Sequence, residues 1–475
     1  MPYNHAIGTL KNSPMFHLSL SSKELFHSNF LYWIWKIDPT AFQTIMINLG
    51  AKNVISWPAW EVLREYESFD LCVVDQKEKK VLLVLENKVK SIPYKAQLDK
   101  YEKKVQELYG VYKDFVDLQN GIYKTNGKLY QRSNPNNPKS VEDKFKKYDQ
   151  YKSVDFILLT LPSGFPDQGT IQQQGKWVIA TYSQYLNTIK NLTIQQGYKK
   201  DILTDYCSFV GALLDVYYTW KNNCYQLSST LLNTPYIADA EELRIHDLYH
   251  KSKYAQICAE IQSKIQPHIQ GKVSIIENDD KVIFSKLSNT QNRSSKFIAF
   301  GYGYTNGQPF VDVKVAFRDG DHPIHHPIIC IIQAQGGWYR HGIIMNHSKL
   351  SKYYGTKDQR IWNYLGKNNV MPIGGNIICV NGHEWMRFEN FASGAVGKMN
   401  SLSNIKSVID DNGSNIVDAN DLYPNCKSRK DSQPYGKYAG DNSNIGMIYQ
   451  YRKLDSYVRV EQLIDYIVND VMRLI

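Results

Sequence analysis

The sequence predicts an α/β (α+β) protein in which a mixed sheet flanked by helices is followed by a β-rich C-terminal half. Helix-spaced apolar residues between 21 and 50 precede strand-like runs of period two between 54 and 88. The run VDFILLTLP, over 154–162, is continuously apolar, which is typical of a strand buried on both faces of a sheet. Half-exposed and fully buried strands with helices between them favour a mixed sheet.

Two helices are expected before the first strand. The segment KELFHSNFLYWIWKI begins after a serine N-cap, at Ser21 or Ser22, and stops at an Asp-Pro pair. The segment TAFQTIMINLG ends on Gly50, a residue that tolerates the left-handed cap conformation. A meander of three strands should follow, formed by VISWPAWEVLREYESF, FDLCVVD and VLLVLENKV, the last two joined by the polar turn QKEKK.

The first domain is predicted to extend over residues 1–235. A helix from Lys95 to about Val116 follows the meander. Residues 117–150 contain a stretch rich in Asn, Gly and Pro, which indicates an insertion. The buried strand at 154–162, a strand GKWVIATY and a helix containing YCSFVGALLDVYYTW complete the domain.

The second half is predicted to begin with a linking helix over 236–270. Residues 271–475 then form a β-rich domain with a final helix, VRVEQLIDYIVNDVMRLI. The expected strands are KVSIIEN, KVIFSKL, KFIAFGYGY, FVDVKVAF and HPIICIIQAQ. Because this half shows no catalytic constellation, we expect a recognition, regulatory or oligomerisation module.

Composition narrows the class of protein. A chain of 475 residues is about twice the size at which one hydrophobic core stops growing, so two domains are expected. Hydrophobic residues make up 43% and charged residues 21%, which excludes a disordered chain. The formal charge of +10, from 56 Lys and Arg against 46 Asp and Glu, permits a polyanionic partner such as nucleic acid.

The cysteines and the N-terminus favour a cytoplasmic protein. The seven cysteines lie far apart without a CxxC pair, which excludes a zinc ribbon and a thioredoxin-type pair, and their apolar neighbours indicate reduced thiols. We find neither an export signal nor a membrane span. Walker, GxSxG, Rossmann and kinase motifs are also absent, so competing enzyme classes have no support.

One group of charged residues has the side chains and the spacing of a catalytic site. Asp70 opens a predicted strand, and Glu86 and Lys88 stand two residues apart near the end of the next. Residues i and i+2 of a strand point to the same face, so Glu86 and Lys88 should project together. The hairpin between the strands brings Asp70 alongside them, with the backbone carbonyl of Asn87 in between.

These groups suit hydrolysis of a phosphodiester bond. Carboxylate and carbonyl oxygens are ligands that Mg²⁺ prefers, and Mg²⁺ keeps several bound waters, one of which can attack. A lysine beside such a water can orient it or stabilise charge on the phosphate. Burying Glu86 and Lys88 after the apolar run VLLVL would be costly without such a purpose.

The motif resembles that of the PD-(D/E)XK nucleases, also called restriction-endonuclease-like, over roughly the first 190 residues. Their pattern is an Asp at the start of one strand and (Asp or Glu)-x-Lys on the next, here Asp70 and Glu86-Asn87-Lys88, although Phe69 replaces the usual Pro. The family's preceding helix often supplies an acid, which Glu24 matches. Some members carry Gln-x-x-x-Tyr on the following helix, which Gln97 and Tyr101 match.

The resemblance implies a restriction-endonuclease-like mixed sheet and a nuclease that uses Mg²⁺, for which Mn²⁺ can substitute. It assigns metal ligation to Asp70, Glu86, the carbonyl of Asn87 and Glu24. It assigns catalysis to Asp70, Glu86 and Lys88, assisted by Gln97 and Tyr101. Ordinary alternatives stay open for the assisting residues: Glu24 as a first-turn acid favoured by the helix dipole, and Gln97 and Tyr101 as packing at i and i+4.

The expected substrate is nucleic acid, with DNA favoured. Stand-alone bacterial proteins resembling this family often act in restriction or defence against foreign DNA, so the resemblance implies such a role by analogy. One alternative is a catalytically silent nucleic-acid-binding or sensor protein. Another is an RNA nuclease activated by a ligand on the C-terminal half. A homo-oligomer is compatible with each of these, and no membrane partner is expected.

A lysine-rich stretch supports a polyanionic substrate. Nine lysines stand against four acids between Lys77 and Lys104, and KFKKYDQYK forms a second cluster. We expect these lysines to line a phosphate-tracking groove beside the metal site, although for any single lysine a solvated helix face is the simpler explanation.

Overall fold

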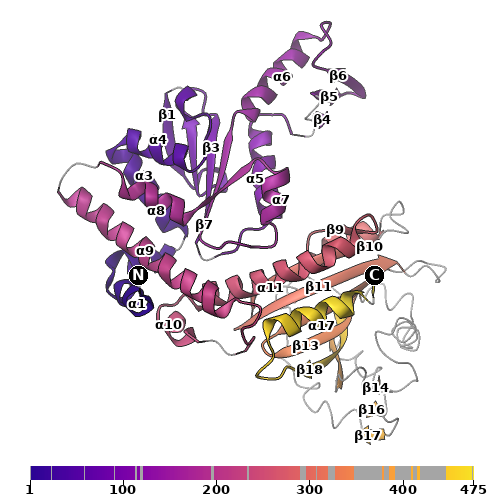
Figure 1. Ribbon diagram of the computed structural model, residues 1–475. Helices are drawn as coiled ribbons and strands as arrows, with labels where there is room; N and C mark the ends of the chain where they lie inside the picture. The colour runs from indigo at the N-terminus through magenta and orange to yellow at the C-terminus, as the bar shows by residue number, and fades with distance from the viewer. Residues whose placement is uncertain are drawn as a thin grey trace. The chain divides into compact units, whose positions relative to one another are not determined.

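The computed structural model consists of two compact units (Figure 1). The α/β unit comprises Met1–Asn223 and Tyr236–Ser252, and the β-rich unit comprises Cys224–Pro235 and Lys253–Ile475. The predicted fold class is therefore confirmed, whereas the domain boundaries at 235 and 270 stay predictions. The structure describes 2–346 and 445–475 except for 23, 58, 90, 113–114, 118–120, 194–196, 233–234, 289–295, 306, 319–326 and 473, and it also describes 377–378, 385–390, 408–409 and 415–417.

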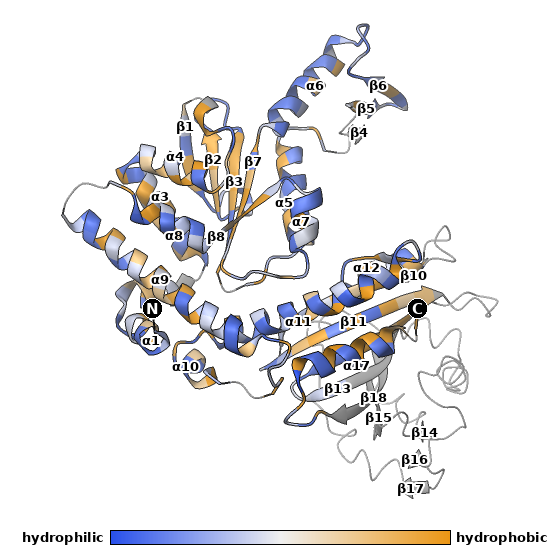
Figure 2. Ribbon diagram, viewed as in Figure 1, coloured by the Kyte–Doolittle hydropathy of each residue, from blue (hydrophilic) through white to orange (hydrophobic). Residues whose placement is uncertain are grey.

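A five-stranded mixed sheet forms the centre of the α/β unit, in the order β1-β2-β3-β7-β8. Strands β1, β2 and β3 form the predicted antiparallel meander, and β7 and β8 run parallel to β3. The first strand is shorter than predicted, because Val54–Ser56 and Tyr66–Ser68 on its two sides form 3-10 turns. Figure 2 shows β2, β3 and β7 as hydrophobic strands between more polar helices. The strands are β1 (Trp60–Arg64), β2 (Leu71–Asp75), β3 (Val81–Lys88), β7 (Asp155–Thr160) and β8 (Trp177–Thr181).

Helices cover both faces of this sheet. Those that position the site are α3 (Glu24–Ile37) and α8 (Tyr182–Lys190) on one face and α5 (Lys95–Leu108) on the other. Apart from the insertion, the other helices of the α/β unit are α1 (Tyr3–Asn12), α2 (Pro14–Ser22), α4 (Pro39–Asn48), α7 (Gln168–Gln174), α9 (Tyr198–Cys224), α10 (Ile237–Glu242) and the start of α11 (His246–Ile269), with single turns η1 (Val54–Ser56) and η2 (Tyr66–Ser68). No helix in the described ranges is long and apolar enough to cross a membrane.

The predicted insertion forms a small subdomain. Its three-stranded sheet contains β4 (Phe115–Asp117), β5 (Ile122–Thr125) and β6 (Lys128–Gln131), and helix α6 (Lys139–Lys152) follows. Tyr123, Val141 and Phe145 form its own apolar cluster, with Tyr130 packed against it. The stretch rich in Asn, Gly and Pro therefore contains a hairpin whose strands are short, four residues each.

Gly50 meets a conformational demand that only glycine satisfies easily. Its φ is +104°, and a Cβ built there would lie 2.7 Å from Val178 Cγ1. We therefore expect Gly50→Ala to lower the free energy of unfolding by about 2 kcal/mol, from backbone strain and overpacking. Urea unfolding measures this change. The matched control is Gly8→Ala within α1, where a Cβ meets nothing within 4 Å and stability should hold or rise; equal losses at both positions would contradict the prediction.

A seven-stranded sheet dominates the β-rich unit, in the order β15-β18-β13-β12-β11-β10-β9. Neighbouring strands are antiparallel except for β9 and β10. The strands are β9 (Val273–Ile275), β10 (Lys296–Thr305), β11 (Gln308–Arg318), β12 (Pro327–Gln335), β13 (Trp338–Asn346), β15 (Trp385–Asn390) and β18 (Ile445–Lys453). A smaller sheet contains β14 (Ile377–Ile378), β16 (Val408–Ile409) and β17 (Asn415–Val417).

Helices pack on this larger sheet as well. The later part of α11 and the predicted final helix, α17 (Val460–Met472), share one buried cluster with β11 and β12. The segment KVIFSKL, predicted as a strand, instead lies in helix α12 (Asp280–Ser288). The strand prediction is wrong because Asp279 accepts hydrogen bonds at the helix start, and Ile283 and Leu287, spaced i and i+4, are buried in one cluster with Ile329 and Ile331.

Lys253 gives the β-rich unit a pH-dependent stability. Its buried Nζ donates to the carbonyls of Leu231 at 2.8 Å and Thr230 at 3.1 Å, and burial lowers the pKa of Lys253 to about 8. The unfolded chain keeps this proton up to a pKa near 10.4. Between pH 8 and 10 the unfolded state therefore binds more protons, and this side chain makes the free energy of unfolding rise with pH.

We expect the free energy of unfolding of wild type, minus that of Lys253→Met, to increase as the pH is raised from 8 to 10. The two proteins share every other titratable group, so the slope of this difference isolates the titration of Lys253. Thermal unfolding of both proteins across this range measures it, and parallel curves would refute the assignment.

Candidate active site

Two strand ends bring the predicted catalytic residues together. Asp70 immediately precedes β2, and Glu86 and Lys88 lie in the last three residues of β3. Leu71 pairs with Leu85 across the two antiparallel strands, so one step further along the register Asp70 stands opposite Glu86. Because side chains alternate along a strand, Glu86 and Lys88 share one face of the sheet.

The two carboxylate oxygens of Glu86 have different surroundings. Oε1 accepts hydrogen bonds from Lys88 Nζ at 2.6 Å, Gln97 Nε2 at 3.1 Å and Tyr101 Oη at 3.4 Å. Oε2 is buried and has no hydrogen-bond partner among the described residues. Only 1% of Glu86 is exposed, so this oxygen is desolvated without compensation. The arrangement fixes one oxygen and leaves the other available to a ligand.

Lys88 lies between two acidic residues. Its Nζ is 2.6 Å from Glu86 Oε1 and 3.9 Å from Glu24 Oε2. The other oxygen of Glu24 accepts hydrogen bonds from the backbone N–H and the hydroxyl of Ser91, just beyond β3. Glu24 thus lies beside Lys88, where α3 begins, and its role as a metal ligand stays a prediction.

Helix α5 presents Gln97 and Tyr101 to Glu86 from the sheet face that carries the motif. Gln97 Nε2 also donates to Tyr101 Oη at 3.1 Å, which links the two side chains across one helical turn. Asp167 Oδ2 accepts a hydrogen bond from the N–H of Lys95 at 2.7 Å and so anchors the start of α5. Asp167 was not predicted from the sequence, because it lies 72 residues from Lys95 and has no local signal.

Asn87 contributes to the site through its backbone. Its N–H donates to Asp70 Oδ2 at 2.8 Å, which orients that carboxylate. Its side chain points to the opposite sheet face, where it contacts Ser28 and Tyr182. Neither partner was predicted from the sequence. For Ser28 a signal existed, because it follows Glu24 by four residues and so shares its helix face.

Burial and mutual repulsion raise the pKa values of the two acids. Burial, then the charge of Asp70, raises the pKa of Glu86 to about 8 against the opposing effect of Lys88. Burial also raises the pKa of Asp70, although the Asn87 N–H and Lys88 oppose it. Burial lowers the pKa of Lys88, but Glu86 and Glu24 outweigh it, so that pKa is raised and the side chain stays an ammonium at neutral pH.

The donor set suits a hard divalent cation. The described residues contain no cluster of three or more His, Cys, Asp and Glu placed to hold a metal. Asp70 and Glu86 nevertheless offer two carboxylates, one with a buried oxygen that lacks a partner, and the backbone carbonyl of Asn87 is a further candidate donor. Mg²⁺ is commonly held by one or two carboxylates with water completing its octahedron, so these residues fit it.

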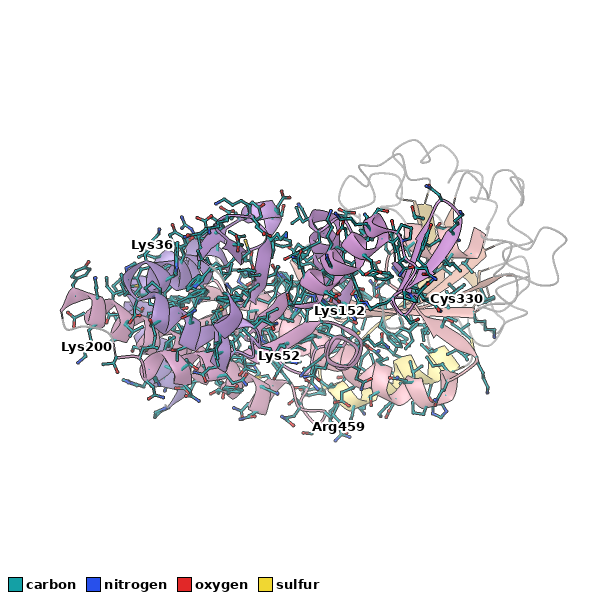
Figure 3. The ribbon with its side chains drawn as sticks, turned by 90° about the horizontal axis from the view of Figure 1, so that it is seen from above. Lys36, Lys52, Lys152, Lys200, Cys330 and Arg459 are labelled. Atoms are coloured by element: carbon teal, nitrogen blue, oxygen red, sulfur yellow. The ribbon has the colours of Figure 1, made fainter. Side chains whose placement is uncertain are left out.

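The positive charge is more dispersed than the sequence predicted. Lys77, Lys79 and Lys80 occupy the hairpin before β3, whereas Glu86 and Lys88 end that strand, so the prediction that these hairpin lysines lie beside the site is wrong. Lys79 pairs with Glu61 and Lys80 with Glu78. Figure 3 shows Lys36, Lys52, Lys152 and Lys200 at separate places on the surface. On α5, which begins near the site, Lys100 and Lys103 are exposed.

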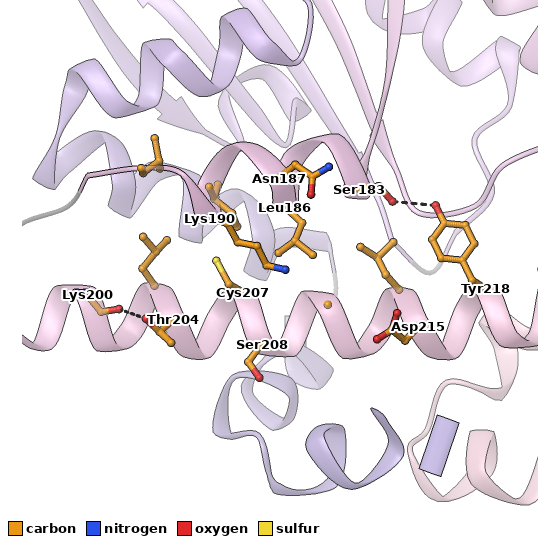
Figure 4. A pocket seen from close by; sticks show the side chains of 15 residues that line it. Ser183, Leu186, Asn187, Lys190, Lys200, Thr204, Cys207, Ser208, Asp215 and Tyr218 are labelled. Carbon is orange, nitrogen blue, oxygen red and sulfur yellow. Dashed lines mark hydrogen bonds between the residues drawn. The ribbon is translucent and has the colours of Figure 1, made fainter. Parts of the chain in front are cut away.

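A cavity of about 640 Å³ lies elsewhere in the α/β unit, between α8 and α9 (Figure 4). Leu186 and Cys207 are among its apolar lining residues, and the hydroxyls of Ser183 and Tyr218 are hydrogen-bonded at 2.9 Å. None of the predicted site residues lines it. The cavity is therefore separate from the site that contains the Asp70 and Glu86 carboxylates.

Comparison with known proteins agrees with this geometry. No curated protein and no solved structure matches the chain significantly. A family model described as the PD-(D/E)XK nuclease superfamily matches residues 15–284, which is more than half of the chain and includes every residue of the site. The family generally uses divalent metals and acts on nucleic acid. The chain therefore belongs to the PD-(D/E)XK nuclease superfamily.

Proposed function

We propose that this protein is a Mg²⁺-dependent nuclease that hydrolyses phosphodiester bonds in DNA, and that Mn²⁺ can replace Mg²⁺. The observation that carries the proposal is the asymmetry of Glu86: three donors hold Oε1, while buried Oε2 has no described partner and Asp70 stands opposite. A purely structural carboxylate would have both oxygens paired.

Each residue then has a distinct task. Asp70, Glu86 and the carbonyl of Asn87 would hold the metal, which when bound would polarise the phosphate and lower the pKa of a coordinated water. Lys88, as an ammonium, donates hydrogen bonds; it would orient the attacking water and stabilise negative charge on the phosphate. Gln97 and Tyr101 keep Glu86 in one orientation by donating to Oε1.

The biological part of the proposal is defence against foreign DNA in the cytoplasm. The net charge of +10 and the exposed lysines of α5 support a polyanionic substrate. Cys72, Cys207 and Cys330 are buried free thiols, as is usual in a reducing compartment. The β-rich unit supplies recognition, regulation or self-association in this proposal.

Cleavage assays with the full-length protein test the activity. Single- and double-stranded DNA and RNA are incubated with Mg²⁺, Mn²⁺, Ca²⁺ or EDTA. We expect cleavage of DNA with Mg²⁺ and Mn²⁺ and none with EDTA. Cleavage that persists in EDTA, or no cleavage of any substrate with either metal, would overturn the proposal. Cleavage of RNA alone would overturn the assignment of DNA.

A further inference from the structure

The side chain of Asn87 takes part in a closed polar group behind the catalytic strand. Its Nδ2 donates to the hydroxyl of Ser28 on α3, and its Oδ1 accepts from Tyr182 Oη on α8 at 3.4 Å. Asn87 and Ser28 are fully buried, and Tyr182 is 1% exposed. Three separate elements thus meet through polar side chains alone, and we call Ser28, Asn87 and Tyr182 the polar trio.

A polar trio is an unusual choice for the interior of this unit. The neighbouring positions on the same sheet face, Leu85 on β3 and Leu71 on β2, are apolar and buried. Burying amide and hydroxyl groups costs free energy unless each finds a partner, and even then the net gain is small. Stability alone therefore gives little reason for Asn rather than a leucine at this position.

The trio restrains the peptide that the active site uses. Asn87 lies between Glu86 and Lys88, and its own N–H donates to Asp70 Oδ2 at 2.8 Å. A shift of Asn87 along or across the strand would move this N–H, both neighbouring side chains and the carbonyl together. Behind the sheet, Tyr182 is held in place because Thr181 and Gln184 form a capping box that sets the start of α8 at Tyr182.

We infer that the polar trio is a positioning device for the metal site. Ser28 and Tyr182 hold the Asn87 side chain from behind the sheet, and this hold sets the spacing between the Asp70 and Glu86 carboxylates. The inference rests on the proposed function, since it concerns the residues that would hold the cation. None of the trio's side chains reaches the motif face; Ser28 and Tyr182 act through Asn87, and Asn87 acts through its backbone.

The test compares two ways of disrupting the trio. Ser28→Ala removes the hydroxyl that accepts from Asn87 Nδ2 and donates to the Glu24 carbonyl at 3.5 Å, and it leaves the Asn87 amide unsatisfied. The triple variant Ser28→Ala, Asn87→Leu, Tyr182→Phe replaces every polar member by an apolar group of similar size, which should leave stability close to wild type. The matched control is Ser19→Ala, since Ser19 is a buried serine whose hydroxyl donates to Phe16 O at 2.7 Å, away from the site.

Calorimetric titration of Mn²⁺ into each full-length protein, without substrate, gives the readout, and thermal unfolding confirms that each is folded. We expect the Mn²⁺ dissociation constant to rise about 10- to 100-fold in Ser28→Ala and in the triple variant, as for other residues that orient metal ligands, and to stay unchanged in Ser19→Ala. The KM for DNA at saturating metal should not change, because the trio does not face the substrate.

A folded triple variant that binds Mn²⁺ as tightly as wild type would overturn the inference and leave the proposed nuclease function intact. If the triple variant does not fold, the same comparison between Ser28→Ala and Ser19→Ala decides. A wild-type protein that binds no Mn²⁺ and cleaves no nucleic acid overturns the proposed function itself, which separates the two failures.

Discussion

Glu86→Gln is expected to abolish metal binding and to lower the rate of DNA cleavage by about a thousandfold. The amide keeps the size of the side chain, but it cannot lose a proton to give the carboxylate charge that Oε2 would offer to a bound cation. Metal ions contribute several kcal/mol of transition-state stabilisation, and about 4 kcal/mol corresponds to this factor. Single-turnover cleavage and Mn²⁺ titration measure the two effects.

The chain offers a matched control for this substitution. Glu61 also lies in the sheet of the α/β unit and pairs with a lysine, Lys79, but this pair is next to the hairpin, away from the end of β3. Glu61→Gln should therefore leave both metal binding and cleavage unchanged. If Glu86→Gln cleaves DNA at a rate close to that of Glu61→Gln, Glu86 does not hold a catalytic metal.

Lys88→Met should separate catalysis from metal binding. The substitution keeps much of the side-chain length but removes the ammonium, and groups that orient water or stabilise charge contribute about 10²- to 10⁴-fold to the rate. We expect a loss of that size at saturating Mg²⁺, with Mn²⁺ binding retained because both carboxylates remain. Rates and titrations on the same preparation check the prediction.

Lys79→Met is the corresponding control, since it removes the lysine of the distant Glu61 pair. It should cleave DNA like wild type. An unchanged rate in Lys88→Met would remove Lys88 from the mechanism, whereas loss of Mn²⁺ binding together with cleavage would show that Lys88 maintains the site instead of acting on the substrate.

Local patterns were sufficient for most of the α/β unit. The meander β1-β2-β3 follows from β-rich apolar runs, the last two joined by a polar turn, and the joint projection of Glu86 and Lys88 follows from strand alternation. Gly50 was placed correctly because a left-handed cap makes a strong demand on one residue. The helices α1, α2, α7 and α8 were not predicted. For α8 a signal existed, because Tyr182, Tyr185, Leu186 and Ile189 stand at i, i+3, i+4 and i+7 after a capping box.

The remainder depends on contacts between distant residues. Asn87 contacts Ser28 and Tyr182 across 59 and 95 positions. The spacing of Ser28 from Glu24 indicates a shared helix face, but it does not predict the contact with Asn87. The segment of α12 was misassigned because a short apolar run fits either a strand or a helix until its packing is known. The hairpin lysines were predicted at the wrong end of the sheet. They are close to Glu86 in the sequence, but the hairpin lies at the start of β3 and Glu86 lies near its end.

The interleaving of the two units limits how the chain can be divided. The backbone passes from one unit to the other three times, after Asn223, Pro235 and Ser252. A fragment that ends at 235 would lack 236–252 of the α/β unit and would carry 224–235 away from the β-rich unit. No single cut in the chain therefore separates a complete α/β unit from a complete β-rich unit. Neither one proteolytic cleavage nor one truncation point gives both units intact.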